Sequence, residues 1–294
     1  TSDENAGASQ NKPFGLVCSC QLMVYIIVHI AAFVIARFAL GLHLLYSKHM
    51  KKFLTKKIRL RPRLQAAADM INGSHLAADI GCDHGRLSVA LLQQGRADRV
   101  IASDISAPSL QKATELAALC GLGSRLTTVL SDGMAHLGPD EADAIAICGM
   151  GGELIARILE ANLPAAKNAR CITMQPMRGI EELRQFLRKN EFRIIDERLV
   201  LDAGRIYQII GAKSGDPAPL PGWFPQDEYS FGPTLFEKRD PLLIPLLESY
   251  RDGHLRRLEK ARRKGVTPKA LTEIIGRMNG YINIAQEMHK NEAE

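Results

Sequence analysis

The stretch that decides the fold is His75-Leu-Ala-Ala-Asp-Ile-Gly-Cys-Asp-His-Gly-Arg86. The apolar residues before Gly81 predict a short buried strand, and residues 87–94 after Gly85 predict a helix. A strand, a glycine turn and the start of a helix form the nucleotide-binding crevice of a parallel α/β sheet. The stretch therefore predicts such a sheet, although an ordinary turn between a strand and a helix would have the same pattern.

The charge of this turn favours one kind of cofactor. In a dinucleotide-binding turn the backbone approaches a pyrophosphate, so the glycine positions of G-x-G-x-x-G are small and uncharged. Here Asp83 stands at the second glycine position, where its carboxylate would repel a pyrophosphate and attract a cationic sulfonium. The pattern Asp79-x-Gly81-x-x-x-Gly85 therefore fits S-adenosylmethionine (SAM) better than NAD, and an NAD dehydrogenase becomes a distant alternative.

Composition sets the broad class of protein. The chain has 294 residues, 46% of them hydrophobic and 24% charged, which is ordinary for one large globular domain or two smaller ones. Its net charge of +6 favours a polyanionic partner. The six cysteines lack the paired spacing of a metal site, so the sequence predicts no metal and a reduced, cytoplasmic enzyme.

The N-terminal part differs from the rest. Residues 1–13 are polar, residues 14–46 are strongly apolar, and a basic cluster follows. Residues 14–36 are long enough to cross a bilayer as a helix, which would make them an inner-membrane tether for the following domain. Alternatively, Met50 is the natural start and residues 1–49 are an upstream extension without function. A membrane partner is expected only in the first case.

From residue 63 onward the signals for strands and helices alternate regularly, which places a SAM-dependent methyltransferase domain at residues 50–214. Ser106 caps one of the helices, with Pro108 in its first turn. Asp202-Ala-Gly204 predicts the turn of a closing antiparallel hairpin. The alternation predicts a doubly wound α/β fold, a Rossmann-like sheet of the class I methyltransferase kind. The predicted strands are 76–80, 99–103, 126–130, 142–147, 171–174, 192–201 and 205–212, and the predicted helices are 63–71, 87–94, 106–120, 153–160 and 180–189.

Ligands of such sheets bind outside the carboxyl ends of the strands, so the residues at these ends are the site candidates. Asp104 closes the second strand about 20 residues after the glycine turn, where a carboxylate can accept the ribose hydroxyls. Asp132 closes the third strand, where it either accepts the adenine amino group or belongs to a plain Asp-Gly turn. Gly149-Met-Gly-Gly152 closes the fourth strand and lets the backbone approach a ligand closely.

The C-terminal part has a different pattern. A linker over 215–229 is followed by two helix signals, 242–264 and 267–288, which predict a helical hairpin over 230–294. The first helix carries a basic face, which is either plain solvated surface or a contact for RNA phosphates. This face includes Arg256, Arg257, Lys260, Arg262 and Arg263, and a second basic patch is expected from Lys56, Lys57, Arg59, Arg61 and Arg63.

Taken in order, these motifs resemble a known family. Asp79-Ile-Gly-Cys-Asp-His84, Ala102-Ser-Asp-Ile105, Asp132-Gly133, Cys148-Gly-Met-Gly-Gly152 and Met174-Gln-Pro176 resemble those of the bacterial TrmK family, and the likeness extends from residue 58 to the C-terminus. The resemblance implies a Rossmann-like domain followed by a helical, coiled-coil-like domain. It also implies SAM-dependent methylation of N1 of adenine 22 in tRNA. Cys82 departs from the family, in which a small hydroxyl residue is usual.

The expected chemistry needs positioning and a negative charge. Adenine N1 has an in-plane lone pair and can attack the methyl group without first losing a proton, but the product is cationic. Asp83 is therefore the first catalytic candidate, and His84 either orients the base or the cofactor carboxylate or is a structural cap. The expected cofactor residues are Asp79, Gly81, Asp83, Gly85, Asp104, Ile105, Asp132, Gly133, Gly149, Met150 and Gly151, and the expected substrate residues are Gly152, Gln175, Pro176, Arg256, Arg257, Lys260, Arg262 and Arg263.

Two other classes of function stay open on the sequence. A methyltransferase for a small metabolite would be active without RNA. A non-catalytic SAM- or RNA-binding module would bind the cofactor without transferring its methyl group. We favour a monomeric enzyme whose partner is tRNA.

Overall fold

The computed structural model describes residues 57–225 and 228–290. The apolar segment 14–46 and the rest of the predicted extension 1–49 lie outside these residues. Among the residues that the structure describes, no helix combines the length and the apolar character needed to cross a bilayer. The described part contains most of the predicted methyltransferase domain and of the predicted helical hairpin.

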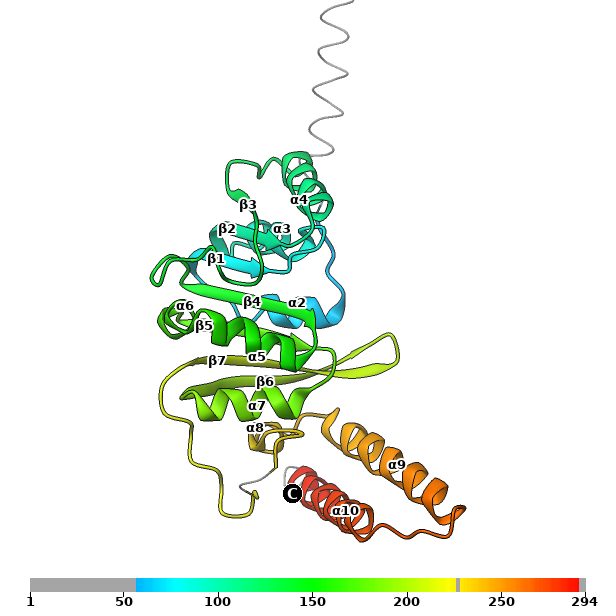
Figure 1. The fold of residues 1–294 in the computed structure, drawn as a ribbon. Coiled ribbons are helices and arrows are strands. Elements are labelled where there is room, and N and C mark those ends of the chain that lie inside the picture. Colours follow the sequence, from blue (N-terminus) through cyan, green and yellow to red (C-terminus); the bar gives the residue numbers. More distant parts are fainter. Residues whose placement is uncertain (1–56, 226–227, 291–294) are drawn as a thin grey trace, which may run out of the picture. The chain divides into compact units, whose positions relative to one another are not determined.

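A seven-stranded sheet with the strand order β3-β2-β1-β4-β5-β7-β6 forms the centre of the fold (Figure 1). The strands from β1 to β5 run parallel, whereas β7 is antiparallel to both β5 and β6. The strand order reverses between β1 and β4, which is where ligands bind in doubly wound sheets. The predicted fold class is therefore confirmed. The strands are β1 (Ser74–Ile80), β2 (Ala97–Asp104), β3 (Leu126–Leu130), β4 (Ala144–Met150), β5 (Cys171–Pro176), β6 (Phe192–Asp202) and β7 (Arg205–Ser214).

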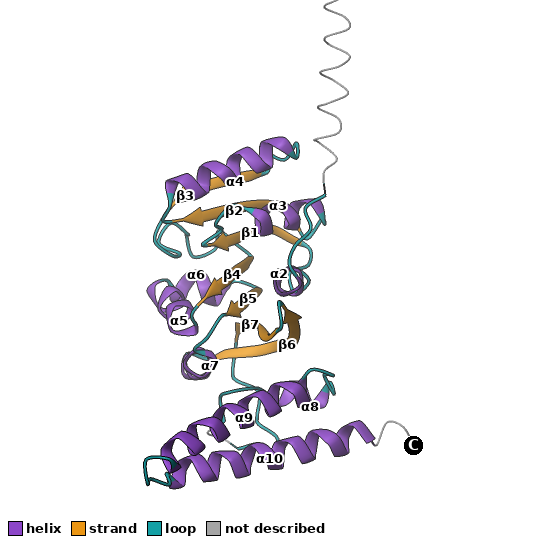
Figure 2. Cartoon of the chain, turned by 90° about the vertical axis from the view of Figure 1, so that its right-hand side faces the viewer, coloured by secondary structure: helices purple, strands orange, loops and turns teal. Residues whose placement is uncertain are grey.

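Helices cover both faces of the sheet (Figure 2). Neighbouring residues of β1 belong to different buried clusters, because side chains alternate between the two faces of a strand. Ala78 packs in one cluster with Ile155 and Leu183, whereas Ala77 packs in the other with Leu91. The first cluster includes residues of α5 (Gly152–Ala161), α6 (Leu163–Asn168) and α7 (Ile180–Lys189), and the second includes residues of α2 (Pro62–Ala68), α3 (Arg86–Gln93) and α4 (Ala107–Leu119).

The local signals for caps and turns are confirmed where they were clearest. Ser106 is the N-cap of α4, and its Oγ accepts a hydrogen bond from the amide of Ser109. The turn between β6 and β7 contains Ala203 and Gly204, with φ values of 50° and 76°. A two-residue hairpin turn needs positive φ at both residues to match the right-handed twist of its strands.

The fourth strand differs from its prediction at both ends. It was expected at 142–147, but β4 runs over Ala144–Met150. Cys148 and Met150 continue the ladder with β5, and a register shift between them leaves Gly149 unpaired. The glycine-rich segment is thus partly strand and not wholly loop, and a bulge of this kind re-aims the side chains that follow it.

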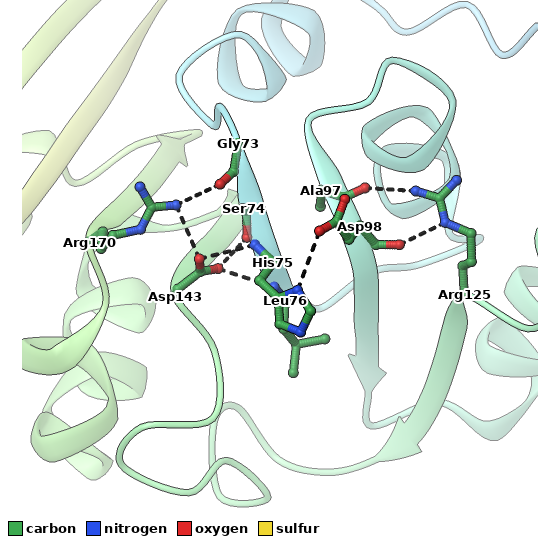
Figure 3. A network of polar contacts seen from close by, with 9 residues as sticks. All are labelled: Gly73, Ser74, His75, Leu76, Ala97, Asp98, Arg125, Asp143 and Arg170. Carbon is green, nitrogen blue, oxygen red and sulfur yellow. Dashed lines mark hydrogen bonds and ion pairs between the residues drawn. The ribbon is translucent and has the colours of Figure 1, made fainter.

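A polar network joins the amino ends of several strands, on the side of the sheet opposite the cleft-forming carboxyl ends (Figure 3). Asp143 accepts hydrogen bonds from the hydroxyl of Ser74 and from the amides of His75 and Leu76, and it forms an ion pair with Arg170 at 3.1 Å. Although partial burial opposes ionisation, these hydrogen bonds hold the pKa of Asp143 below its ordinary value. The network therefore joins the start of β1 to the segments that lead into β4 and β5.

The C-terminal part contains α8 (Pro233–Glu237), α9 (Leu243–Arg262) and α10 (Lys269–Lys290). The long helices α9 and α10 lie side by side, as the predicted hairpin requires (Figure 2). Met278, Ile282 and Ala285, which lie in the predicted helix 267–288, are buried, together with Tyr281. Leu199 of β6 belongs to the same cluster, so this part shares a core with the edge of the sheet. The domain boundaries themselves stay predictions.

Candidate active site

A cleft of about 550 Å³ opens at the carboxyl ends of β1, β2 and β4. It lies where the strand order reverses, which is the expected position of the ligand in this class of fold. The structure brings ten of the predicted catalytic and cofactor residues together here. They are Asp79, Gly81, Asp83, His84, Asp104, Ile105, Asp132, Gly133, Gly149 and Met150.

Asp79 supplies a buried negative charge beneath the glycine turn. It is only 2% exposed, at the end of β1, and its carboxylate accepts a hydrogen bond from the hydroxyl of Ser88. Burial raises the pKa of Asp79 to about 6, and the hydrogen bond from Ser88 opposes the rise. Asp79 is therefore ionised at neutral pH, in a place where a cation would offset the cost of its burial.

Asp83 and Asp104 are held together by the backbone. The amide of Asp83 donates a hydrogen bond to Oδ2 of Asp104 over 3.0 Å, and Oδ1 of Asp104 accepts another from the amide of Ser106 over 2.9 Å. Asp83 has a φ of 51°, and its side chain is 76% exposed. The left-handed backbone thus turns one carboxylate toward the open cleft and leaves the other anchored at the end of β2.

His84 lies beside Asp83, but its role is not fixed by that contact. Its Nε2 is 3.4 Å from Oδ1 of Asp83 and 3.1 Å from Nζ of Lys112 on α4. A lysine ammonium can only donate, so in that contact Nε2 of His84 accepts and cannot at the same time donate to Asp83. The arrangement allows His84 to orient a ligand or to link the turn to α4.

Positions 81 and 149 require glycine for different reasons. Gly81 has a φ of 69°, and a Cβ there would stand 2.0 Å from Cε of Met150. The methyl end of Met150 therefore lies directly over the turn. Gly149 has a φ of 79°, and a Cβ there would stand 3.8 Å from Nη1 of Arg63. Its main constraint is the left-handed backbone of the bulge.

Two glycines expected to contact ligands pack against protein. Gly85 begins α3, and a Cβ there would stand 2.6 Å from Cβ of Ala113, so this glycine lets α3 and α4 approach each other. A Cβ on Gly152 would stand 1.7 Å from the carbonyl oxygen of Gly179. Neither residue lines the cleft. A neighbouring element fills the space beside each glycine, and direct contact with a ligand stays a prediction for both. Gly152 lines a separate hollow together with Gly151.

The remaining expected contacts also lie outside the cleft. Gly151 lines a separate hollow beside Arg157 and Arg178. Gln175 and Pro176 are buried, and Oε1 of Gln175 accepts a hydrogen bond from Nη1 of Arg63 over 2.6 Å. As placed, Gln175 supports Arg63 of the cleft, whereas Pro176 lines a second hollow beside Tyr207. Their assignment as substrate contacts stays a prediction.

Arg63 is the residue of the site that the sequence misassigned. It was expected in an open basic patch with Arg61, but both arginines form ion pairs with Asp202 at 3.2 Å, and Arg63 also lines the cleft. No local pattern signals this placement, because Asp202 lies in the distant hairpin turn. Lys56, of the same expected patch, lies outside the described residues.

Neither a reactive thiol nor a metal cluster is found around the cleft. Cys82 and Cys148 line it, and burial raises the pKa of both thiols, to about 12 for Cys82. They therefore stay protonated and are poor nucleophiles at neutral pH. Among the residues that the structure describes, no group of three metal-ligating side chains exists.

The predicted basic face is present on α9. All five of its predicted residues are exposed, which leaves their charges free to meet a polyanion. They are Arg256, Arg257, Lys260, Arg262 and Arg263.

Fold and cleft together define a methyltransferase of the Rossmann-like class. Residues 60–210 match the family model described as a methyltransferase domain, which is half of the chain. The chain is 33% identical over 160 residues to the tRNA (adenine(22)-N(1))-methyltransferase of Bacillus subtilis (strain 168), and the alignment covers 54% of this chain and 67% of that protein. The chain belongs to the TrmK family.

Solved structures agree with this membership. The crystal structure of the B. subtilis m1A22 tRNA methyltransferase TrmK superposes with a TM-score of 0.66 and 25% identity, covering 79% of this chain and 99% of that one. A candidate tRNA (m1A22) methyltransferase from Streptococcus pneumoniae, solved in complex with S-adenosyl-L-methionine, gives a TM-score of 0.66 and 26% identity over 75% of this chain and 98% of that one.

Proposed function

We propose that this protein transfers the methyl group of SAM to N1 of adenine 22 in tRNA. The observation that carries the proposal is the acidic cleft, in which Asp79, Asp83 and Asp104 surround a glycine turn at the reversal of strand order. Three carboxylates in one cleft favour a cationic ligand and oppose a pyrophosphate. Membership of the TrmK family supports the choice of tRNA as the substrate.

We assign the cofactor to the cleft as follows. The carboxylates of Asp79 and Asp83 attract the sulfonium, and the carboxylate of Asp104 accepts hydrogen bonds from the ribose hydroxyls. Ile105, which is 74% exposed beside Asp104, offers an apolar surface to the adenine ring. Asp132 accepts the adenine amino group, and Gly133 and Gly149 let the backbone approach the ligand.

The chemistry is a single displacement. The N1 lone pair of the target adenine attacks the methyl carbon, the N–C bond forms, and the C–S bond breaks with its electron pair going to sulfur. S-adenosylhomocysteine leaves, and the base carries the positive charge. We assign Asp83 to stabilising that charge, because among Asp79, Asp83 and Asp104 it is the one with an exposed carboxylate. His84 orients the base or the cofactor carboxylate.

The basic face of α9 supports binding of the rest of the tRNA through phosphates. Lys and Arg side chains that neutralise phosphates contribute affinity without reading sequence. We infer a monomer that acts in the cytoplasm, where its tRNA substrate is found. The free cysteines among the described residues are consistent with a reducing compartment.

One assay separates this proposal from its alternatives. Tritiated methyl transfer to unmodified tRNA with adenine 22, followed by nucleoside mass spectrometry, should give 1-methyladenosine. The same tRNA with guanine at position 22 is the control and should give none. Turnover of SAM without RNA would indicate a small-molecule methyltransferase. Binding of SAM in calorimetry with no transfer to any tRNA would indicate a non-catalytic module.

A further inference from the structure

A second hollow, a groove of about 780 Å³, is walled by the turn after β5, by the hairpin of β6 and β7, and by α9. Arg63 lines the active-site cleft and Tyr207 lines the groove. The Cζ atom of Arg63 lies over the Tyr207 ring, 5.7 Å from its centroid. This contact therefore links the lining of the cleft to the lining of the groove.

Arg63 is fixed in place from several sides. Its Nη1 donates to Oε1 of Gln175 over 2.6 Å, and its Nε lies 3.2 Å from Oδ2 of Asp202. The side chain is only 18% exposed. Because Gln175 is itself buried, the guanidinium has one well-defined position. Arg63 in turn lies over one face of the Tyr207 ring.

From this geometry we propose that Tyr207 is the stacking platform for the target adenine, with Arg63 as its positioning residue. The inference rests on the proposed function, since it concerns how adenine 22 reaches the methyl group. A base inside folded RNA must leave its stack before an enzyme can act on it, and extruded bases are commonly held against aromatic rings. Two tyrosines, Tyr207 and Tyr250, line the groove, and Tyr207 is the one whose ring contacts Arg63 of the cleft.

The charges around the pair act in both directions. Methylation turns a neutral purine into a cation, and the face of a tyrosine ring attracts cations. Arg63 opposes the new charge, and Asp202, which it shares with Arg61, offsets this opposition only in part. The platform therefore acts mainly by stacking against the neutral base.

The groove also has groups suited to the strand that carries the base. Arg178 and Arg205 line it and are exposed. Their guanidinium groups can contact the phosphates on either side of the extruded nucleotide.

The test compares Tyr207→Phe, which keeps the aromatic face, with Tyr207→Leu, which keeps apolar volume without it. Base stacking is worth about 1–3 kcal/mol, so the leucine variant should lose about 5- to 150-fold in kcat/KM for tRNA. The phenylalanine variant should stay within about twofold of the wild type. The Kd of SAM, measured by calorimetry, should be unchanged in both, and so should the melting temperature with SAM bound. A merely structural role would lower that temperature or weaken SAM binding in the leucine variant, and either result would overturn the proposal.

A second measurement reads the base directly and does not depend on turnover. A tRNA with 2-aminopurine at position 22 is bound to the enzyme with S-adenosylhomocysteine present. Stacking on Tyr207 should quench its fluorescence in the wild type and the phenylalanine variant, and the leucine variant should be brighter. Equal fluorescence in all three would overturn the proposal. An inactive wild type would refute the proposed function itself, whereas an active wild type with an unimpaired leucine variant would refute only this inference.

Discussion

The backbone amide of Asp83 donates a hydrogen bond to Oδ2 of Asp104, 3.0 Å away, and so joins the glycine turn after β1 to the carboxyl end of β2. The second oxygen of Asp104 accepts from the amide of Ser106, the N-cap of α4. The carboxylate of Asp104 thus fixes the backbone of Asp83, from which the second carboxylate projects. We therefore expect cofactor binding and the placement of Asp83 to be coupled through Asp104.

The first prediction concerns this coupling. In Asp104→Asn the amide nitrogen cannot accept, so one of the two hydrogen bonds is lost together with the charge. Hydrogen bonds to charged groups are worth about 1.5–3 kcal/mol, so the affinity for SAM should fall by about 10- to 150-fold in calorimetry. Asp98→Asn is the matched control, since Asp98 is 75% exposed at the start of the same strand, and it should leave the Kd unchanged. An unchanged Kd in Asp104→Asn would place the ribose elsewhere.

The second prediction separates rate from binding at Asp83. Asparagine tolerates the left-handed φ of 51° at this position, so Asp83→Asn removes the charge without straining the turn. We expect kcat to fall by about 10- to 100-fold, because the cationic product loses its counter-charge. Asp83→Ala should also remove most of the rate, with added backbone strain. Single-turnover kinetics measures the chemical step, and a full chemical rate in Asp83→Asn would contradict the assignment.

The third prediction is a dependence on pH with opposite signs for binding and stability. Burial raises the pKa of Asp79 to about 6 from its ordinary 3.8. As pH falls from 7 to 5 the carboxylate takes up a proton, and SAM affinity should drop by about tenfold. A raised folded-state pKa means that the folded form binds the proton more tightly than the unfolded one. The free energy of unfolding without SAM should therefore decrease as pH rises from about 4 to 6.

Asp79→Asn provides the control for that prediction. The amide cannot titrate, so it should flatten both the pH profile of SAM affinity and this part of the profile of the free energy of unfolding. Calorimetry and urea unfolding between pH 4 and 7 measure the two profiles. Identical profiles for the wild type and the variant would mean that Asp79 does not titrate in this range.

Local patterns were sufficient for much of the fold. β3 and α7 begin and end at the residues predicted, 126–130 and 180–189, because strand alternation and helix caps act over a few neighbours. The helices α6 and α8 were not predicted. They have 6 and 5 residues, which is too short for a helical period to become visible in sequence.

Contacts between distant segments were beyond that reasoning. Arg63 resembles a surface cation in sequence, and only the return of the hairpin places Asp202 against it. Gly85 and Gly152 sit in turns where a ligand could approach, yet a side chain and a carbonyl oxygen occupy the space that each leaves. A glycine in such a position indicates that another group approaches the backbone closely. Only the tertiary structure shows whether that group belongs to the protein or to a ligand.

The fourth prediction tests whether Gly152 is needed for packing against Gly179. Gly152→Ala would place a Cβ 1.7 Å from the carbonyl oxygen of Gly179, and backbone cannot move aside cheaply. The free energy of unfolding should fall by about 1–3 kcal/mol or more in urea titration. Gly280→Ala in α10 is the control, because nothing lies within 4 Å of its added Cβ. It should raise the free energy of unfolding by about 0.5–1 kcal/mol. A Gly152→Ala protein as stable as the wild type would mean that close packing against Gly179 does not require glycine at this position.

The fifth prediction concerns the basic face of α9. Changing Arg256, Arg257 and Arg262 to glutamate should weaken tRNA binding by more than about tenfold and reduce the slope of log affinity against log salt by about 2 to 3, since each phosphate contact contributes close to one unit. SAM affinity should not change. The matched control reverses Arg99, Lys189 and Lys213, which are also exposed but lie on the side of the sheet where the parallel strands begin, away from the cleft. Equal losses in both triple variants would mean that net charge, and not this face, governs tRNA binding.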